Sequence, residues 1–327
     1  MRAVQISSFG GPEVLEEVEL PEPVPGEGEV LVRLAVAGIN YSDIGWREGK
    51  RGGPLPFIDG SEGAGTIAAL GPGVEGLAEG DRVAYWNPAM GSYAQFALCP
   101  AFRAVKLPDA MDFATGAALM LQGFTAHYLV RSTYPVQEGQ SLLFHAGAGG
   151  VGQIVIQIAK SRGVRVLTTV GNEEKAARAR ELGADETILY DDVDFAQAVL
   201  DLTGGEGVNV AYDAVGAATW EGSIKCTRTR GMVVYFGAAS GPVPAFDTSI
   251  LGANGSLSLA RPTLKDYVQT KEEIQWRADE MFDLWQAGNL IIHQGGAYAL
   301  AEAAEAHADL QGRRTTGKLV LDTNPNY

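Results

Sequence analysis

Cysteine is almost missing from this 327-residue chain, which has only Cys99 and Cys226, far apart in the sequence. Two distant cysteines exclude a disulfide framework and any zinc site built from several cysteines. Basic residues are also few. The chain has 25 lysines and arginines against 40 aspartates and glutamates, which gives a formal net charge of −15. Such an acidic chain is a poor partner for nucleic acid or for an anionic membrane surface.

Long apolar runs are missing as well. No apolar stretch reaches the ~18 residues that a membrane-spanning helix needs. The first residues, Met1 to Ile6, soon lead into polar ones without the apolar core of a signal peptide. We therefore expect a cytoplasmic protein. Its 46% hydrophobic and 20% charged residues are typical of an ordered globular chain, and its length suggests two domains.

Residues 1–122 have the pattern of a small β-rich domain. Hydrophobic residues alternate with a period of two at Val30, Val32, Leu34 and Val36, which indicates a strand. Further short apolar runs at 66–70 and 82–86 are separated by glycine-containing turns.

The pattern changes near residue 115, where an Ala- and Leu-rich stretch over 115–131 predicts a helix. Strands then alternate with helices through residue 260. The strands are expected at 141–145, 164–170, 186–190, 208–212, 231–236 and 256–260, and the helices at 153–160, 174–182, 195–202 and 219–227. This alternation predicts an α/β domain over 123–265, a doubly wound parallel sheet with helices on both faces.

The segment 266–327 is expected to return to the first domain, because its few elements make no core alone. A long helix is predicted at 271–287, with Ile274, Ala278, Met281 and Trp285 as its buried stripe. A shorter helix at 301–310 and a strand at 318–321 follow it.

A complete G-x-G-x-x-G motif runs from Gly147 to Gly152. It lies between a predicted strand ending at His145 and a helix predicted to start near Gln153, which is the context of a Rossmann dinucleotide site. Glycines permit a tight turn close to a pyrophosphate, and the helix N-terminus attracts its charge. The alternative is a merely glycine-rich turn. The strands that follow favour the dinucleotide site, with His145 as a buried core histidine.

The segment after the second strand favours NADPH over NADH. An NAD site needs a carboxylate about 20 residues after the loop to bind the ribose 2′-hydroxyl, but that position is Asn172. Lys175 is placed to meet a 2′-phosphate, whereas Glu173 and Glu174 would repel it. The alternative for Lys175 is a plain surface lysine.

Several motifs together resemble the zeta-crystallin-like quinone oxidoreductases, the zinc-independent branch of the medium-chain dehydrogenase/reductase superfamily. They are the stretches 10–15, 38–43, 80–83, 145–152, 213–216 and 255–262, in this order along the chain. The resemblance implies a GroES-like substrate domain, a Rossmann domain, a cleft between them and a homodimer.

Residue chemistry supports the absence of zinc. Zinc-dependent relatives have a cysteine where this chain has Asn40 and a histidine where it has Ser61. Neither an amide nor a serine hydroxyl is a normal zinc ligand. Without a Lewis acid the acceptor must already be electrophilic, as quinones and activated alkenes are.

The resemblance also implies the site residues. Asn40 is expected to hold the nicotinamide ribose or to polarise a carbonyl oxygen, and Tyr41 to line the pocket, to stack on a ring, to relay a proton or simply to pack. Asp43 is expected at the cofactor, although a helix cap is the commoner role of such a residue. The other implied cofactor contacts are Thr125, Tyr128, Gly147, Gly149, Gly150, Val151, Gly152, Gly171, Lys175, Tyr190, Val215, Phe236, Gly237, Ala238, Ser240, Arg261 and Arg313. Phe236 is alternatively a core residue and Arg313 a surface charge, and a frequent family serine is replaced by Ala214.

The function expected is an NADPH:quinone oxidoreductase that transfers hydride from nicotinamide C4 to a quinone. One alternative is an NADPH-dependent alkenal or enone reductase. A second is an NADPH-binding structural or RNA-binding protein, which the net charge of −15 disfavours.

Overall fold

The computed structural model describes residues 1–312 and 314–324 and divides into two compact units. Unit 1 contains Met1–Phe124, Val268–Phe282 and the chain from Ile292 onward. Unit 2 contains Thr125–Tyr267 and Asp283–Ile291. The C-terminal segment therefore belongs mainly to unit 1, and only a short stretch of it is part of unit 2.

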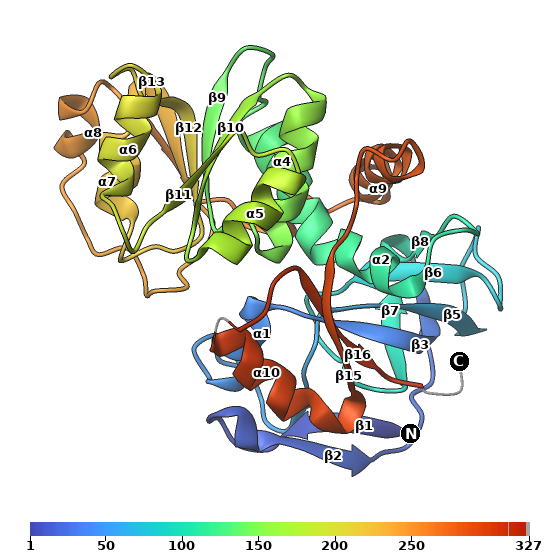
Figure 1. Ribbon diagram of the computed structural model, residues 1–327. Helices are drawn as coiled ribbons and strands as arrows, with labels where there is room; N and C mark the ends of the chain where they lie inside the picture. The colour runs from blue at the N-terminus through green and yellow to red at the C-terminus, as the bar shows by residue number, and fades with distance from the viewer. Residues whose placement is uncertain (313, 325–327) are drawn as a thin grey trace. The chain divides into compact units, whose positions relative to one another are not determined.

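Unit 2 is built on a parallel sheet with the strand order β11-β10-β9-β12-β13-β14. Helices α4 and α5 cover one face and α6 and α7 the other (Figure 1), which confirms the predicted doubly wound α/β fold. The strands are β9 (Ser141–His145), β10 (Arg165–Val170), β11 (Glu186–Leu189), β12 (Val208–Asp213), β13 (Thr227–Tyr235) and β14 (Ser258–Ala260). The helices are α4 (Gly150–Ser161), α5 (Glu173–Glu181), α6 (Phe195–Leu202), α7 (Trp220–Lys225) and α8 (Ser249–Ala253).

The central strand of this sheet is buried on both faces. Leu142, Leu143 and Phe144 of β9 are each at most 2% exposed, which explains why β9 is a continuous apolar run rather than an alternating one. Leu143 packs with Leu167 and Val199 in one core cluster. This core holds the carboxyl ends of the strands in fixed positions.

Unit 1 is a β-rich unit whose larger sheet has the order β15-β16-β3-β5-β6-β8, with β7 also paired to β3. A smaller sheet has the order β2-β1-β4. The strands are β1 (Arg2–Ile6), β2 (Leu15–Glu19), β3 (Glu29–Ile39), β4 (Phe57–Ile58), β5 (Glu62–Leu70), β6 (Arg82–Trp86), β7 (Phe96–Pro100), β8 (Val105–Lys106), β15 (Gln294–Ala299) and β16 (Lys318–Asp322). Helix α1 (Tyr41–Arg47) follows β3 directly, and α10 (Ala303–Gln311) precedes β16.

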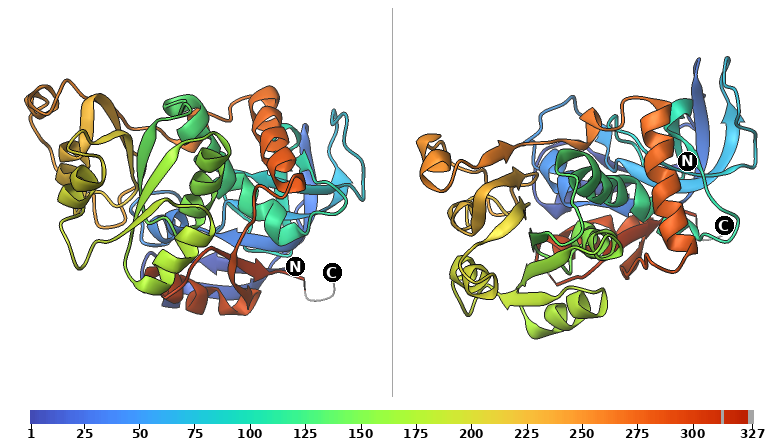
Figure 2. Two further views of the ribbon diagram at one scale, coloured as in Figure 1. Left: turned by 45° about the horizontal axis from the view of Figure 1, so that its top comes forward. Right: turned by 90° about the horizontal axis from the view of Figure 1, so that it is seen from above.

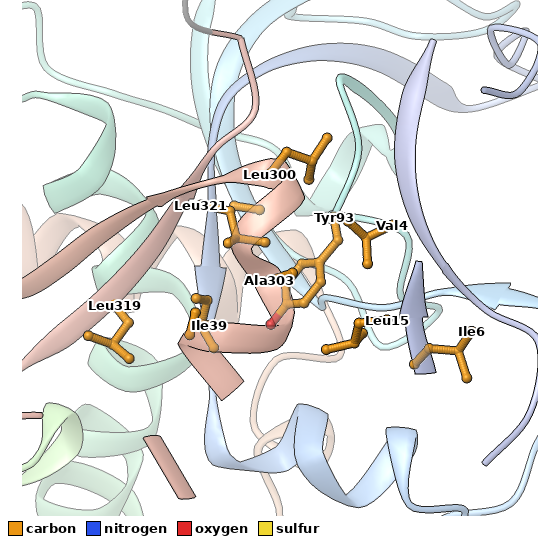
Figure 3. Close-up of a cluster of buried hydrophobic side chains, with 11 residues drawn as sticks. Val4, Ile6, Leu15, Ile39, Tyr93, Leu300, Ala303, Leu319 and Leu321 are labelled. Carbon is orange, nitrogen blue, oxygen red and sulfur yellow. The ribbon is translucent and has the colours of Figure 1, made fainter. Parts of the chain in front are cut away.

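The C-terminal strand is part of the N-terminal sheet. β16 pairs antiparallel with β3, with Leu319 opposite Ile39 and Leu321 opposite Ala37, and Figure 2 shows these red strands among the blue ones. Side chains from both ends of the chain share one core, in which Tyr93 lies among Val4, Leu15, Leu300 and Leu321 (Figure 3).

The helical stretch after residue 112 is more irregular than predicted. Instead of one helix over 115–131, the chain forms α2 (Phe113–Ala118), a π-helical turn η3 (Leu119–Gly123), α3 (Phe124–Tyr128) and a second π-helical turn η4 (Leu129–Thr133). Such π turns are often found at functional sites. Helix α9 (Lys271–Gln286) has Phe282 rather than Trp285 in its buried stripe, because Trp285 is only half-buried. No helix in the described residues is long and apolar enough to cross a membrane.

Candidate cofactor and active site

The glycine loop connects β9 to α4. Ala146, the first residue after the strand, has a left-handed backbone with a φ of 61°, which is uncommon for a residue other than glycine. The N–H of Gly149 donates a 2.9 Å hydrogen bond to the carbonyl of Ala146 and closes the turn. Helix α4 begins at Gly150, three residues before the predicted start, because the last glycines of the motif form its first turn.

Close packing requires glycine at two positions of the loop. A Cβ atom at Gly152 would lie 2.6 Å from the carbonyl oxygen of Ala146, and one at Gly147 would overlap the Thr168 side chain. The first turn of α4 has N–H groups without partners inside the helix, and the helix has 12 residues. This arrangement is suited to a pyrophosphate.

A buried polar network supports the loop from below. The ring of His145 contacts Thr169 Oγ1 at 2.9 Å through Nδ1 and Ser223 Oγ at 3.0 Å through Nε2. Ser223 in turn donates to Asp213 Oδ2 at 2.8 Å. Burial lowers the pKa of His145, so the ring is neutral near pH 7. His145 is therefore a satisfied core histidine, as predicted.

Asp213 fixes the turn after β12. Its Oδ1 accepts hydrogen bonds from the N–H groups of Val215 at 2.8 Å and Gly216 at 2.9 Å. The carbonyl of Val215 accepts from both the N–H and the hydroxyl of Ser240 at 2.8 Å. Two predicted cofactor residues, Val215 and Ser240, are thus joined at the carboxyl ends of neighbouring strands, where ligands bind in open parallel sheets.

The residues expected at the adenosine end lie close together. A Cβ atom at Gly171 would be 2.8 Å from the hydroxyl of Tyr190. Asn172 caps α5, and its side chain accepts a 2.9 Å hydrogen bond from the N–H of Lys175. The Glu173 carboxylate is paired with Arg180 at 2.6 Å, so one of the two acids that would repel a phosphate is compensated.

A cavity of about 290 Å³ lies at the carboxyl ends of β13 and β14. Three of the predicted cofactor residues line it, Gly237, Ala238 and Arg261. Glycine is required at 237, because a Cβ there would lie 2.5 Å from the carbonyl oxygen of Ala214. Phe236 is half-buried, and the centroid of its ring lies 5.6 Å from that of Phe144.

Asn40, in unit 1, is held in a buried cluster that the sequence did not reveal. Its Nδ2 donates to Glu62 Oε1 at 2.7 Å, and its Oδ1 accepts from Lys318 Nζ and Gln122 Nε2 at 3.1 Å each. Lys318 and Glu62 form an ion pair with fully buried side chains. A buried pair of this kind fixes geometry more than it adds stability.

Asp43, the third residue of α1, helps to cap the N-terminus of that helix, whose N-cap residue is Asn40. Its Oδ2 accepts from the N–H of Asn40 at 2.8 Å and from the hydroxyl of Tyr93 at 3.1 Å. The Tyr93 hydroxyl also contacts His307 Nε2 at 2.9 Å, and His307 Nδ1 faces Arg47 at 3.2 Å. Burial raises the pKa of Asp43 to about 6 and lowers that of His307 to about 3. The fully buried carboxylate supports the capping interpretation of Asp43.

The remaining predicted residues differ in exposure. Tyr41 is 45% exposed, whereas Thr125 is 7% and Tyr128 2% exposed. Tyr128 stacks on Tyr267 with ring centroids 4.4 Å apart. Arg313 lies outside the described residues.

The donor set around Asn40 does not suit a zinc ion. The position two residues after Gly38 is an amide, and Ser61 is a hydroxyl, neither of which is a normal zinc ligand. Among residues 1–312 and 314–324, no group of three or more His, Cys, Asp or Glu side chains is placed to hold a metal. Cys99 and Cys226 are buried and unpaired.

Sequence reasoning missed Glu62, Gln122 and Lys318. Glu62 directly follows Ser61 of the motif comparison, and Lys318 is a lone cation at the start of an apolar strand. Lys318 is thus a charged residue within a predicted strand, which is a signal of a buried role, whereas Glu62 lies outside every strand that the sequence predicts. Gln122 had no such signal, because its position depends on the π turn.

A doubly wound sheet with a pyrophosphate loop, together with a β-rich unit that takes in the C-terminal strand, defines the medium-chain dehydrogenase/reductase class. Two family models match the chain: the alcohol dehydrogenase GroES-like domain at residues 26–109 and the zinc-binding dehydrogenase at residues 150–276.

Similar proteins define the family more narrowly. A quinone oxidoreductase of Pseudomonas aeruginosa is 46% identical and covers 98% of this chain and 99% of its own. A 2-haloacrylate reductase of a Burkholderia species is 40% identical and covers 98% of each. The structure of the Escherichia coli quinone oxidoreductase complexed with NADPH superposes with a TM-score of 0.96 at 38% identity, covering 98% of this chain and 100% of its own. The chain belongs to the quinone oxidoreductase family.

Proposed function

We propose that this protein reduces quinones with NADPH. The observation that carries the proposal is the glycine loop, whose close-packed Gly147 and Gly152 lead directly into the N-terminus of α4. This arrangement binds a dinucleotide pyrophosphate. Membership of the quinone oxidoreductase family then supports a quinone as the acceptor.

NADPH is favoured by the charges around the second strand of unit 2. The strand tip has Asn172 where an NAD site would have a carboxylate. Lys175 follows it in the first turn of α5, and the Glu173 carboxylate forms a surface ion pair with Arg180. The E. coli relative was crystallised with NADPH.

The reaction needs no Lewis acid. NADPH supplies a hydride and solvent a proton, so that quinone and NADPH give hydroquinone and NADP⁺. The protein's contribution is to orient the two reactants and exclude water. Asn40 is the residue we assign to the nicotinamide ribose or to the quinone oxygen, with Tyr41 beside it in sequence at the exposed start of α1.

A second candidate activity is reduction of an activated carbon–carbon double bond. The 40% identity to a 2-haloacrylate reductase favours it, and the same hydride chemistry applies. Steady-state rates with 1,4-benzoquinone and with a series of 2-alkenals and 2-haloacrylate separate the two. A higher kcat/KM for the quinone supports the first proposal, and a higher value for the alkenes replaces it with the second.

We further propose zinc independence, a cytoplasmic location and a homodimer. The amide and hydroxyl at positions 40 and 61 support the first. The outer strand β14 supports the last, because its Leu259 is 40% exposed on an unpaired sheet edge in the described chain. Elemental analysis tests zinc independence, and sedimentation tests the homodimer. Bound zinc in each chain or a monomer at micromolar concentration would contradict them.

A further inference from the structure

Gln122 has a buried oxygen atom without a partner. The residue is 8% exposed, and its Oε1 accepts no hydrogen bond although the atom is shielded from solvent. Orphaned buried acceptors are rare and each needs an explanation. Gln122 lies in the π-helical turn η3, which also directs the N–H of Leu121 at Glu62 Oε2, 2.6 Å away.

The orientation of the neighbouring Asn40 amide follows from its two charged partners. Lys318 has only donors to offer, so the atom of Asn40 that faces it must be the oxygen. The Glu62 carboxylate only accepts, so the atom of Asn40 that faces it must be the nitrogen. The usual ambiguity between the two ends of an amide is therefore removed for Asn40.

The same logic then applies to Gln122. Asn40 Oδ1 accepts from Gln122 Nε2 at 3.1 Å, and a reversed Gln122 would place two oxygen atoms in contact. The orphaned Oε1 is therefore the atom of the Gln122 amide that does not face Asn40 Oδ1. All three donors of Lys318 are used, on Ile39 O, Asn40 Oδ1 and Glu62 Oε1, so Lys318 does not turn to satisfy it.

The cluster leaves two hydrogen-bonding functions unused, on two amides that are hydrogen-bonded to each other. One is the second N–H of Asn40, whose amide has its oxygen and its first N–H engaged. The other is the carbonyl of Gln122. A group that accepts one hydrogen bond and donates another satisfies both, and a hydroxyl is the simplest such group.

We propose that Gln122 is a ligand-binding residue that, with Asn40, binds a hydroxyl group of the reactants, and that the Lys318–Glu62 pair orients both amides. This inference rests on the proposed function. A hydroxyl is available from two sources, the ribose of the dinucleotide and the hydroquinone product.

The test compares two buried glutamines with equal exposure. In Gln122→Met the orphaned acceptor is removed, so the free protein should keep its Tm or gain slightly. Ligand affinity should fall about five- to tenfold, the effect of one lost hydrogen bond. Gln157 is also 8% exposed, but its amide bonds Gln153 O and Ile291 N and O. Gln157→Met should therefore lower the Tm by a few degrees without changing ligand affinity.

The source of the hydroxyl follows from which constant changes. A weaker Kd for NADPH, titrated by fluorescence without quinone, assigns the dinucleotide ribose. A weaker inhibition constant for hydroquinone at saturating NADPH, with an unchanged NADPH Kd, assigns the product. Unchanged values of both constants would overturn the proposal, and so would a loss of Tm with intact affinity.

A second variant and a separate readout keep the result interpretable. Gln122→Asn retains the amide but is one methylene shorter, so it reaches Asn40 or the ligand but not both. We expect the same loss of ligand affinity in Gln122→Asn, which therefore replaces Gln122→Met in the test if the methionine variant does not fold. If the wild-type protein fails to reduce quinones, the proposed function fails, whereas the NADPH titration of the variants still decides the role of Gln122.

Discussion

The Asn40 side chain has fewer hydrogen-bonding groups available to a ligand than an amide on the surface would have. Lys318, Glu62 and Gln122 together occupy its oxygen and one of its two N–H groups. Only a single donor is left for a ligand. The role of Asn40 is thereby narrowed to donating one hydrogen bond, to a ribose hydroxyl or to a quinone oxygen.

Replacing Asn40 with alanine should lower kcat/KM for 1,4-benzoquinone by about tenfold, since one positioned hydrogen bond contributes roughly 1–1.5 kcal/mol. The Lys318–Glu62 pair stays intact in this variant, so the protein should remain folded. Steady-state kinetics with NADPH, alongside a thermal melt, measure both effects. Wild-type kinetics in Asn40→Ala would show that the amide only fills space beside the ion pair.

Lys175 is the second residue with a testable charge. A contact from lysine to a 2′-phosphate contributes about 1.5–3 kcal/mol, or roughly one to two decades of affinity. Lys175→Ala should raise the Kd for NADPH by that factor and leave NADH almost unaffected. The difference should shrink with added salt, because a partly exposed ion pair is screened.

A matched change tests the neighbouring acid. Arg180→Ala frees the carboxylate of Glu173, 2.6 Å away in the ion pair, and should weaken NADPH binding while NADH binding stays the same. If Lys175→Ala weakens both cofactors equally, the lysine supports the loop rather than the phosphate.

At the scale of elements, the regular α/β alternation of unit 2 could be predicted well. Periodicity located β9 and α6 with the bounds that the structure has. The start of α4 was placed too late, because glycines predict a loop whereas the last glycines here form the first helical turn. The tertiary position of the motif, not local propensity, decides its conformation.

The elements of unit 1 were harder to predict. Strand β15 (Gln294–Ala299) has two glycines and no strong apolar alternation, and it forms because it pairs with β16. The π turns η3 in unit 1 and η4 in unit 2 were also not predicted, since their backbone pattern does not change the spacing of apolar residues. The cluster around Asn40 joins residues separated by up to 278 positions, and no local pattern reports such a contact.

The glycine loop allows a test at the same scale. Gly152→Ala places a methyl group 2.6 Å from the carbonyl of Ala146, so the first turn of α4 must shift and dinucleotide affinity should drop by at least tenfold. Gly252→Ala is the control, because nothing lies within 4 Å of a Cβ there. Titration of NADPH into both variants measures the effect. An unchanged Kd in Gly152→Ala would remove the loop from the binding site.

At the scale of the whole molecule, buried ionisable groups couple stability to pH. Burial lowers the pKa of His307 to about 3, while an unfolded histidine titrates near 6.5. Below pH 6.5 the unfolded chain binds a proton that the folded protein excludes, so His307 costs stability as the pH falls from about 6.5 to 3. The pKa of Asp43 is raised to about 6 in the folded protein. The folded protein therefore binds this proton before the unfolded chain does, and Asp43 adds stability as the pH falls from about 6 to 3.8.

The histidine contribution is isolated by comparing the protein with His307→Gln. Glutamine can accept from Arg47 and donate to Tyr93, as His307 does through Nδ1 and Nε2. The wild-type protein should lose stability relative to the variant by about 1.4 kcal/mol per pH unit below pH 6.5. Urea unfolding at a series of pH values measures this difference. A difference that does not vary with pH would mean that His307 is protonated in the folded state.

The central claim is that the protein passes hydride from NADPH to a quinone without a metal. The most direct measurement is the steady-state kcat/KM for 1,4-benzoquinone with NADPH and with NADH, on protein dialysed against a chelator. We expect turnover with NADPH that the chelator leaves unchanged and that exceeds the NADH value by roughly one to two decades, the contribution assigned to Lys175. No quinone turnover, equal rates with the two cofactors, or activity that returns only when zinc is added would contradict the account.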